Sequence, residues 1–195
     1  FGYAQKISAV RAALPVEGTL DLCRRPTGGG IVDHRHDWTY ALVIPRGHPL
    51  EDVRATQSYR EIHEALADAL RVQGVDCVLQ ARPDGTGDVS AADPAKVGVC
   101  FQRAEVHDVV QAHGGGKIAG AAQKRNKRGL LFQGSIWRPA AGPAVDWERF
   151  QEDFTAKLAG MLGTTTEPVP WPELSEDEVS GLTEQYSALE WLESR

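Results

Sequence analysis

The segment between residues 24 and 34 carries the side chains best suited to hold an anion. Its relevant residues are Arg24, Arg25, Thr27, Gly28, Gly29, Gly30 and His34. Glycines lack a Cβ atom, so a ligand can approach the backbone closely and φ can be positive. Successive N–H groups in such a turn form an anion-binding concavity, and arginines add fixed positive charge beside it. The segment matches neither of two known phosphate-binding motifs, the Walker A loop and G-x-G-x-x-G. The alternative to an anion site is a Gly-rich hairpin turn at the surface.

The cysteines indicate a reducing compartment and allow for a single catalytic thiol. The chain has three, Cys23, Cys77 and Cys100, and no C-x-x-C pair. An odd count without such a pair argues against a disulfide framework or a zinc ribbon. His34 and His36 form an H-x-H pair without a third placed ligand, so no metal site is predicted.

Composition is that of an ordinary globular domain. The chain has 195 residues, of which 42% are hydrophobic and 25% charged, and its net charge is −6. The basic cluster within 117–128 has no interspersed aromatic residues, so nucleic-acid binding is not predicted. No apolar run approaches the ~18 residues of a membrane helix. Without a secretory leader, the predicted location is the cytoplasm.

The elements that must position these residues alternate irregularly. The predicted strands are Leu20–Arg24, Ile31–His34, Trp38–Ile44, Val75–Gln80, Glu105–Gln111, Lys117–Gln123 and Gly129–Trp137. Ser58 has capping-box spacing for a helix that ends at Gly74, although that helix can begin a turn earlier. Asp146 is expected to cap a second helix and Ser175 a third. Without strict βαβ alternation, these elements predict a mixed α/β or α+β fold.

Two sequence blocks resemble a known family. Segment 24–34 followed by Asp-Trp-Thr-Tyr at 37–40 resembles the signature of the lipoate–protein ligase A and octanoyltransferase family. The Lys-Ile-Ala-Gly-Ala-Ala-Gln block at 117–123, followed by 131–136, resembles its other hallmark. The resemblance implies the biotin/lipoate protein ligase fold, with a mostly antiparallel mixed sheet flanked by helices.

The resemblance also implies a division of the chain. A catalytic domain is expected over 1–166, and a Pro-rich linker with a C-terminal helix, packed on the same domain, over 167–195. Family members usually have a helix and a strand before the Phe-Gly-Tyr segment that opens this chain, and these are expected to be missing here. Many members carry aspartate directly after the histidine, whereas this chain has Arg35 there and the acid at Asp37.

The residues ahead of Lys117 resemble the cysteine-dependent octanoyltransferases of this family. ATP-dependent lipoate ligases usually show an Arg-Asn-Asp-like segment, whereas this chain has Val99-Cys100-Phe101 and then Asp108. In the octanoyltransferases the Cys-Phe motif carries the nucleophile. The resemblance therefore implies Cys100 as the nucleophile.

The implied reaction moves an octanoyl group from acyl carrier protein to the lysine of a lipoyl domain or glycine-cleavage H protein. Cys100 would accept the acyl group as a thioester before the lysine amine arrives. A free thiol titrates near about 8.5, so it needs positive charge, for which Lys117 is the candidate. Lys117 can also stabilise the oxyanion or accept the amine's proton. Backbone N–H groups near Gly29–Gly30 or Gly120–Ala121 can complete an oxyanion hole, and His34 can orient the carbonyl or shape the pocket.

Two alternatives stay open. In an ATP-dependent lipoate–protein ligase, an acyl-adenylate would be held by Arg24, Arg25, Gly28–Gly30 and Lys117. That reaction would need ATP and Mg, whereas octanoyl transfer needs no cofactor. The other alternative is an acyl- or carrier-binding module that has lost turnover. The chain is expected to be a monomer with no nucleic-acid or membrane partner.

Overall fold

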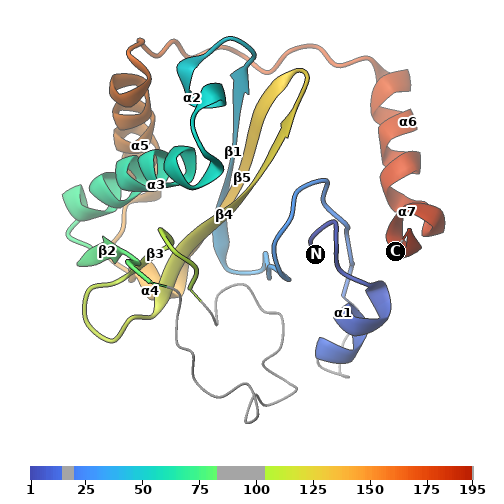
Figure 1. The fold of residues 1–195 in the computed structure, drawn as a ribbon, viewed down its shortest axis with the longest axis horizontal. Coiled ribbons are helices and arrows are strands. Elements are labelled where there is room, and N and C mark those ends of the chain that lie inside the picture. Colours follow the sequence, from blue (N-terminus) through green and yellow to red (C-terminus); the bar gives the residue numbers. More distant parts are fainter. Residues whose placement is uncertain (15–19, 83–103, 195) are drawn as a thin grey trace.

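An antiparallel sheet with helices on both sides makes up the described part of the chain (Figure 1). The structure is a computed structural model that describes residues 1–14, 20–82 and 104–194. The helices are α1 (Ile7–Ala13), α2 (Pro49–Asp52), α3 (Ala55–Val72), α4 (Arg138–Ala141), α5 (Trp147–Leu162), α6 (Glu176–Ser187) and α7 (Leu189–Glu193). The strands are β1 (Asp37–Pro45), β2 (Cys77–Leu79), β3 (Val109–Gln111), β4 (Lys117–Asn126) and β5 (Gly129–Trp137). The predicted α+β fold is confirmed.

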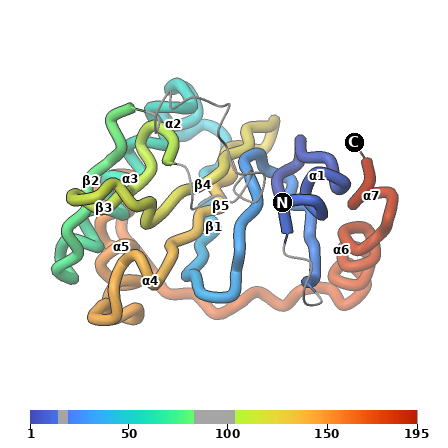
Figure 2. The backbone as a smooth tube through the Cα atoms, turned by 90° about the horizontal axis from the view of Figure 1, so that it is seen from below, coloured from blue at the N-terminus to red at the C-terminus, as the bar shows by residue number. Residues whose placement is uncertain are grey.

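The strand order is β1-β5-β4-β3-β2, and helices α3 and α5 cover one face of the sheet. Side chains alternate along β1, as expected for a half-buried strand. Tyr40, Leu42 and Ile44 pack toward the helices, whereas Thr39 and Ala41 point to the opposite face and are exposed. The N-terminal segment, α1 and α6 lie on that opposite side (Figure 2). None of the described helices combines the length and apolarity that crossing a bilayer requires.

Helix ends follow the sequence signals in two of three cases. The side chain of Asp146 accepts hydrogen bonds from two first-turn N–H groups of α5, which ends at Gly163 in the left-handed region. Ser175 caps α6 by accepting one hydrogen bond, from Glu178 N. The helix begins one turn before Ser58, which is the alternative that the sequence left open: α3 starts at Ala55, so Ser58 is buried inside the helix and does not cap it. Its hydroxyl donates to the backbone oxygen of Ala55 at 3.1 Å instead.

The two strands predicted before β1 are also wrong. Segment 20–24 forms no strand, and in segment 31–34 the sole ladder contact is an isolated bridge at Ile31. The N-terminal segment makes single hydrogen bonds to the chain between Cys23 and Thr27, and Phe1 N donates to Cys23 O at 2.7 Å. Arg25 N donates to Phe1 O at 3.0 Å, and Tyr3 N donates to Thr27 O at 2.9 Å. These contacts are too few and too irregular for a ladder.

Arg24 joins the two ends of the described chain. Its side chain is fully buried, and the guanidinium donates to the carbonyl oxygens of Tyr3 at 2.5 Å, Gln5 at 3.0 Å and Leu192 at 2.6 Å. In return, Trp191 Nε1 donates to the Arg24 carbonyl at 2.9 Å. A buried arginine needs such a set of acceptors. Arg24 therefore holds α7 against the N-terminal segment.

Candidate active site

A cavity of about 1010 Å³ lies between segment 24–34 and the strands β1, β4 and β5, with Trp171 from the linker at its wall. The sequence-predicted site residues that line it are Arg25, Gly29, His34, Lys117, Gly120 and Ala121. The two sequence blocks, far apart in the chain, thus meet in one cavity. Cys100, the predicted nucleophile, lies outside the described residues.

Lys117 is held in a buried ion pair at the cavity wall. Its Nζ lies 2.7 Å from Asp108 Oδ2, and the two residues are 8% and 1% exposed. Asp108 also accepts hydrogen bonds from the Tyr59 hydroxyl at 2.5 Å and from Glu105 N at 2.7 Å. A buried charge is tolerated when it is paired and hydrogen-bonded in this way. The pair places the positive charge of a lysine at the cavity wall.

Tyr59 ties this ion pair to the edge of the sheet. β3 pairs with β4 no further than Ala119, so the next outward N–H of β4 has no strand partner. That group, Ala121 N, donates to the Tyr59 hydroxyl at 2.9 Å. The Ala121 N–H predicted for an oxyanion hole is therefore already bonded. Burial, together with the charge of Asp108, raises the pKa of Tyr59 well above its ordinary value, so the hydroxyl stays a donor.

Gly120 leaves the space that the Lys117 side chain occupies. A Cβ atom at Gly120 would lie 2.7 Å from Lys117 Cε, 2.8 Å from Nζ and 3.0 Å from Asp108 Oδ1. Real Cβ contacts are not this short, so the ammonium would have to move. The small residue in the lysine block is thus a steric requirement of the ion pair.

Gly120→Ala is expected to displace Lys117 and to lower acyl-transfer activity by about tenfold, since misplaced catalytic groups lose rate steeply. Overpacking should also lower the free energy of unfolding by about 1–3 kcal/mol. Gly160→Ala is the control, because a Cβ there meets nothing within 4 Å and the site is an exposed helical position. This control variant should raise the free energy of unfolding by up to about 1 kcal/mol and should not change the rate of acyl transfer. Equal activity in Gly120→Ala and wild type would contradict the steric argument.

His63 is a buried neutral histidine behind the ion pair. Its Nδ1 donates to His107 O at 2.7 Å, and Nε2 has no hydrogen-bond partner among the described residues. Burial, the largest influence, lowers its pKa from 6.5 to about 4. The folded protein therefore binds this proton less readily than the unfolded chain does.

The free energy of unfolding is expected to fall as the pH drops from 6.5 to about 4. Above pH 6.5 the His63 imidazole is neutral in both states, whereas between 6.5 and about 4 it is protonated in the unfolded chain alone. The free energy of unfolding is expected to be lower by about 3 kcal/mol at the acidic end of this pH range. Denaturant unfolding from pH 4 to 7.5 measures it. His63→Leu should flatten the dependence by that amount, and His113→Leu, at an exposed position, should not. Parallel curves for His63→Leu and wild type would overturn this assignment.

Arg25 donates its side-chain hydrogen bonds to the backbone of its own segment, 24–34. Arg25 Nη2 donates to Gly28 O at 2.6 Å and to Gly30 O at 2.9 Å, which fixes the turn. Gly29, at φ +91°, has the left-handed conformation that favours glycine. Thr27 is buried, and its hydroxyl donates to Gln133 Oε1 at 2.8 Å. Gly28, Gly30, Thr27 and Arg24 thus shape the segment and do not line the cavity.

The two other cysteines differ sharply. Cys77 is buried, and burial raises the pKa of its thiol to about 11, which keeps the thiol protonated and unreactive. Cys23 is exposed. Within the described residues, no group of three His, Cys, Asp or Glu side chains is placed to hold a metal ion.

Sequence reasoning missed the partners of the predicted residues. The sequence alone gives neither Tyr59 nor Asp108 a role in the site. Two signals were available. A buried tyrosine usually needs a partner for its hydroxyl, and a lysine in a strand of an apolar sheet needs a carboxylate. Neither signal identifies which acid or which hydroxyl the fold supplies.

Comparison with known proteins places these features in a family context. The family model described as lipoyl protein ligase A/B catalytic domain matches residues 1–138. Octanoyltransferase LipM of Kyrpidia tusciae is 30% identical over 202 residues, covering 86% of this chain and 72% of the relative. Octanoyltransferase LipM of Geobacillus kaustophilus is 32% identical over 189 residues, covering 90% of this chain and 66% of the relative. Other LipM relatives are covered over as little as 41% of their length.

Solved structures agree at the level of the fold. Protein Ta0514 of T. acidophilum with bound lipoic acid has a TM-score of 0.64 and 21% identity, covering all of this chain and 80% of that one. Lipoate-protein ligase A bound with ATP has a TM-score of 0.63 and 20% identity, covering 98% of this chain and 79% of that one. The sheet-and-helix arrangement is therefore shared with lipoate-protein ligases.

Proposed function

The chain belongs to the lipoyl protein ligase A/B catalytic domain family, and on this premise we propose that it is an octanoyltransferase. It takes octanoyl from acyl carrier protein and attaches it to the lysine of a lipoyl domain or glycine-cleavage H protein. The observation that carries the proposal is the buried Lys117–Asp108 ion pair at the wall of the cavity. The names of the LipM relatives supply the substrate class.

Cys100 is the proposed nucleophile. Its thiolate attacks the carbonyl of the carrier thioester, the new C–S bond forms, and the carrier sulfur leaves as a thiolate with the electron pair of the broken C–S bond and takes a proton from solvent. Cys100 precedes the ion-pair residue Asp108 by eight positions in the sequence. This short separation along the chain supports a shared site. The sequence pattern Cys-Phe followed by the lysine block supports it further.

Lys117 acts in this proposal as a fixed charge. Its ammonium favours the thiolate form of the cysteine and the oxyanion that develops on the attacked carbonyl. Of the roles that the sequence left open, proton acceptance is the one the ion pair disfavours. Asp108, Tyr59 and Gly120 set the position of the ammonium.

The transfer is expected to need neither ATP nor Mg, because the thioester donor is already activated. The experiment mixes octanoyl-carrier protein, a lipoyl domain and the chain without ATP, and follows the mass of the lipoyl domain. Octanoylation that is lost in Cys100→Ser and kept in Cys23→Ser supports the proposal. Acylation that requires ATP and free acid and survives Cys100→Ser identifies a ligase. No acylation in either arm, with carrier binding intact, identifies a binding module.

A further inference from the structure

Gln133 places a side-chain amide at the cavity, held from one side. Its Oε1 accepts the hydrogen bond of the Thr27 hydroxyl at 2.8 Å. Thr27 is 1% exposed, and its carbonyl oxygen accepts a hydrogen bond from Tyr3 N, so the hydroxyl is fixed in place. An amide that accepts with its oxygen turns its NH2 group the other way. Gln133 lines the cavity, and its Nε2 makes no hydrogen bond to the described residues.

The neighbours of Gln133 across the sheet are alanines. Gln133 pairs with Ala41 of β1 on one side and with Ala122 of β4 on the other. Paired residues of an antiparallel sheet share a face, so these three side chains form one row. All three line the cavity. The amide therefore stands between two methyl groups, where an alkyl chain can lie beside a hydrogen-bond donor.

The next row along the strands carries the ammonium of the site. Gly120 pairs with Ser135, and a Cβ atom at Gly120 would lie 2.8 Å from Lys117 Nζ. The lysine nitrogen therefore lies over the row of Gly120 and Ser135. This row is two residues from that of Gln133, or ~7 Å along the strands. The amide of Gln133 and the ammonium of Lys117 thus face neighbouring parts of one cavity.

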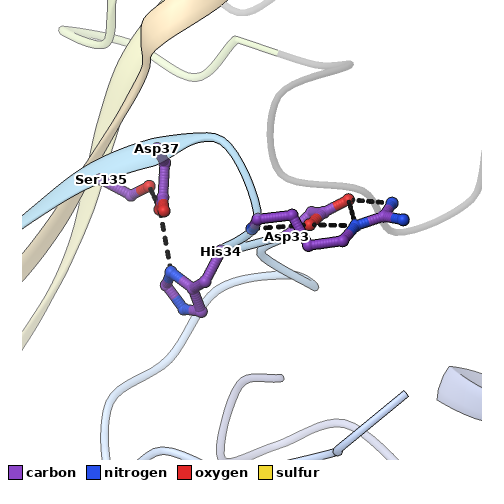
Figure 3. A network of polar contacts seen from close by, with 5 residues as sticks. Asp33, His34, Asp37 and Ser135 are labelled. Atoms are coloured by element: carbon purple, nitrogen blue, oxygen red, sulfur yellow. Dashed lines mark hydrogen bonds and ion pairs between the residues drawn. The ribbon is translucent and has the colours of Figure 1, made fainter. Parts of the chain in front are cut away.

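The hydroxyl proton of Ser135 is already committed in this arrangement. Ser135 donates to Asp37 Oδ2, which also lies 2.8 Å from His34 Nδ1 (Figure 3). The Asp37 side chain is 2% exposed, so this carboxylate is held inside the protein. Among the described side chains of β5 that line the cavity, Gln133 is the one whose donor is left for a ligand.

We propose that Gln133 Nε2 donates a hydrogen bond to the carbonyl oxygen of the bound acyl group, and that Thr27 is the positioning residue that orients the amide. This inference rests on the proposed function, which supplies octanoyl as the acyl group. The contact is noncovalent and involves described residues alone. A carbonyl oxygen can only accept, so it matches the NH2 end of the amide and not the oxygen end. The alanines beside it suit the alkyl chain.

Two small probes with the same kind of alkyl chain test this contact. 2-Nonanone is the octanoyl group with a methyl in place of the sulfur, and its carbonyl can only accept. Octylamine carries an ammonium, which can only donate. Binding to the full chain at pH 7 is measured by isothermal titration calorimetry. Gln133→Leu should weaken 2-nonanone binding about tenfold, the size of one lost hydrogen bond, and leave octylamine binding within about twofold of wild type.

Gln133→Glu should reverse the preference of the site. Glutamate keeps an oxygen for the Thr27 hydroxyl and turns a second, negatively charged oxygen toward the cavity. The ratio of 2-nonanone affinity to octylamine affinity should therefore fall by at least about tenfold. The control is Gln57→Leu, because Gln57 is exposed on α3 and its Nε2 donates to Glu61. This variant should bind both probes like wild type.

Thr27 is tested as a positioning residue by a double-mutant cycle. Thr27→Val keeps the shape, removes the hydroxyl and releases the amide. It should weaken 2-nonanone binding several-fold in wild type and have no further effect in Gln133→Leu. Equal losses in the two backgrounds would show that Thr27 acts on the fold and not through Gln133, and would overturn its positioning role.

Octanoyl transfer from the carrier is measured in parallel, so that the two proposals fail separately. If Gln133→Leu binds 2-nonanone as tightly as wild type, or if wild type does not bind it, the inference is overturned, and wild-type transfer then leaves the proposed function standing. If wild type binds 2-nonanone through Gln133 but transfers no octanoyl group, the proposed function fails and the carbonyl contact stands.

Discussion

Lys117→Met should lower the rate of acyl transfer by about 10²–10³, the usual cost of removing one preorganised group that stabilises developing charge. Methionine keeps most of the length of the side chain and removes the ammonium. The rate is measured as octanoylation of a lipoyl domain from octanoyl-carrier protein, with circular dichroism to show that the variant is folded. A second readout is alkylation of Cys100 at pH 7, which should slow because the thiolate loses its nearby charge.

The matched control is Lys124→Met, on the same strand. Lys124 is exposed and its Nζ lies 6.0 Å from the centre of the Tyr3 ring, away from Asp108. This variant should transfer within about twofold of wild type, since the contacts of an exposed lysine are weak. Equal rate losses in the two variants would mean that the general charge of β4, rather than the buried ammonium, matters.

Asp108→Asn is expected to lower the free energy of unfolding by about 3–5 kcal/mol, because it leaves the buried ammonium of Lys117 without its counter-charge. Asparagine keeps the shape but has a single accepting oxygen, whereas Tyr59 and Glu105 N donate to different oxygens of Asp108, so the loss combines the missing charge with one missing hydrogen bond. Denaturant unfolding at constant pH measures it. Asp68→Asn is the control, because that acid pairs with Arg71 at the surface and should cost less than about 1 kcal/mol.

The double variant Lys117→Met with Asp108→Asn sharpens this prediction. Replacing both members of a buried pair removes the unpaired charge, so the double variant should be more stable than Asp108→Asn alone. Additive losses would show that the two residues do not interact across the 2.7 Å contact. Activity should stay low in either case, since the ammonium is absent.

The sequence predicted the main sheet and its helices because their signals are local. The β-rich run of residues 38–44 and the cap at Asp146 each depend on a few neighbouring residues. The region before β1 could not be predicted in this way. Whether residues 20–24 join a sheet depends on which backbone lies beside them, and that backbone is the N-terminal segment, some twenty residues away.

Some residues of the candidate site could likewise be predicted from the sequence, and the contacts of others could not. Lys117, Gly120, His34 and Gly29 stand in recognisable blocks, and the structure places all four around one cavity. Arg24 stands in the same block, yet its guanidinium is taken up by three backbone carbonyls. A residue type shows what a side chain can bind, but the fold decides whether a ligand or the backbone supplies the partner.

Peptide mapping of the octanoyl-loaded protein tests the central claim most directly. The chain is mixed with octanoyl-carrier protein without an acceptor or ATP, digested at low pH and analysed by mass spectrometry, with hydroxylamine treatment to identify a thioester. The account predicts a hydroxylamine-sensitive octanoyl group on the peptide that contains Cys100, formed more slowly in Lys117→Met than in Lys124→Met. Octanoylation of a lipoyl domain that proceeds at full rate while Cys100 never carries the acyl group would contradict it.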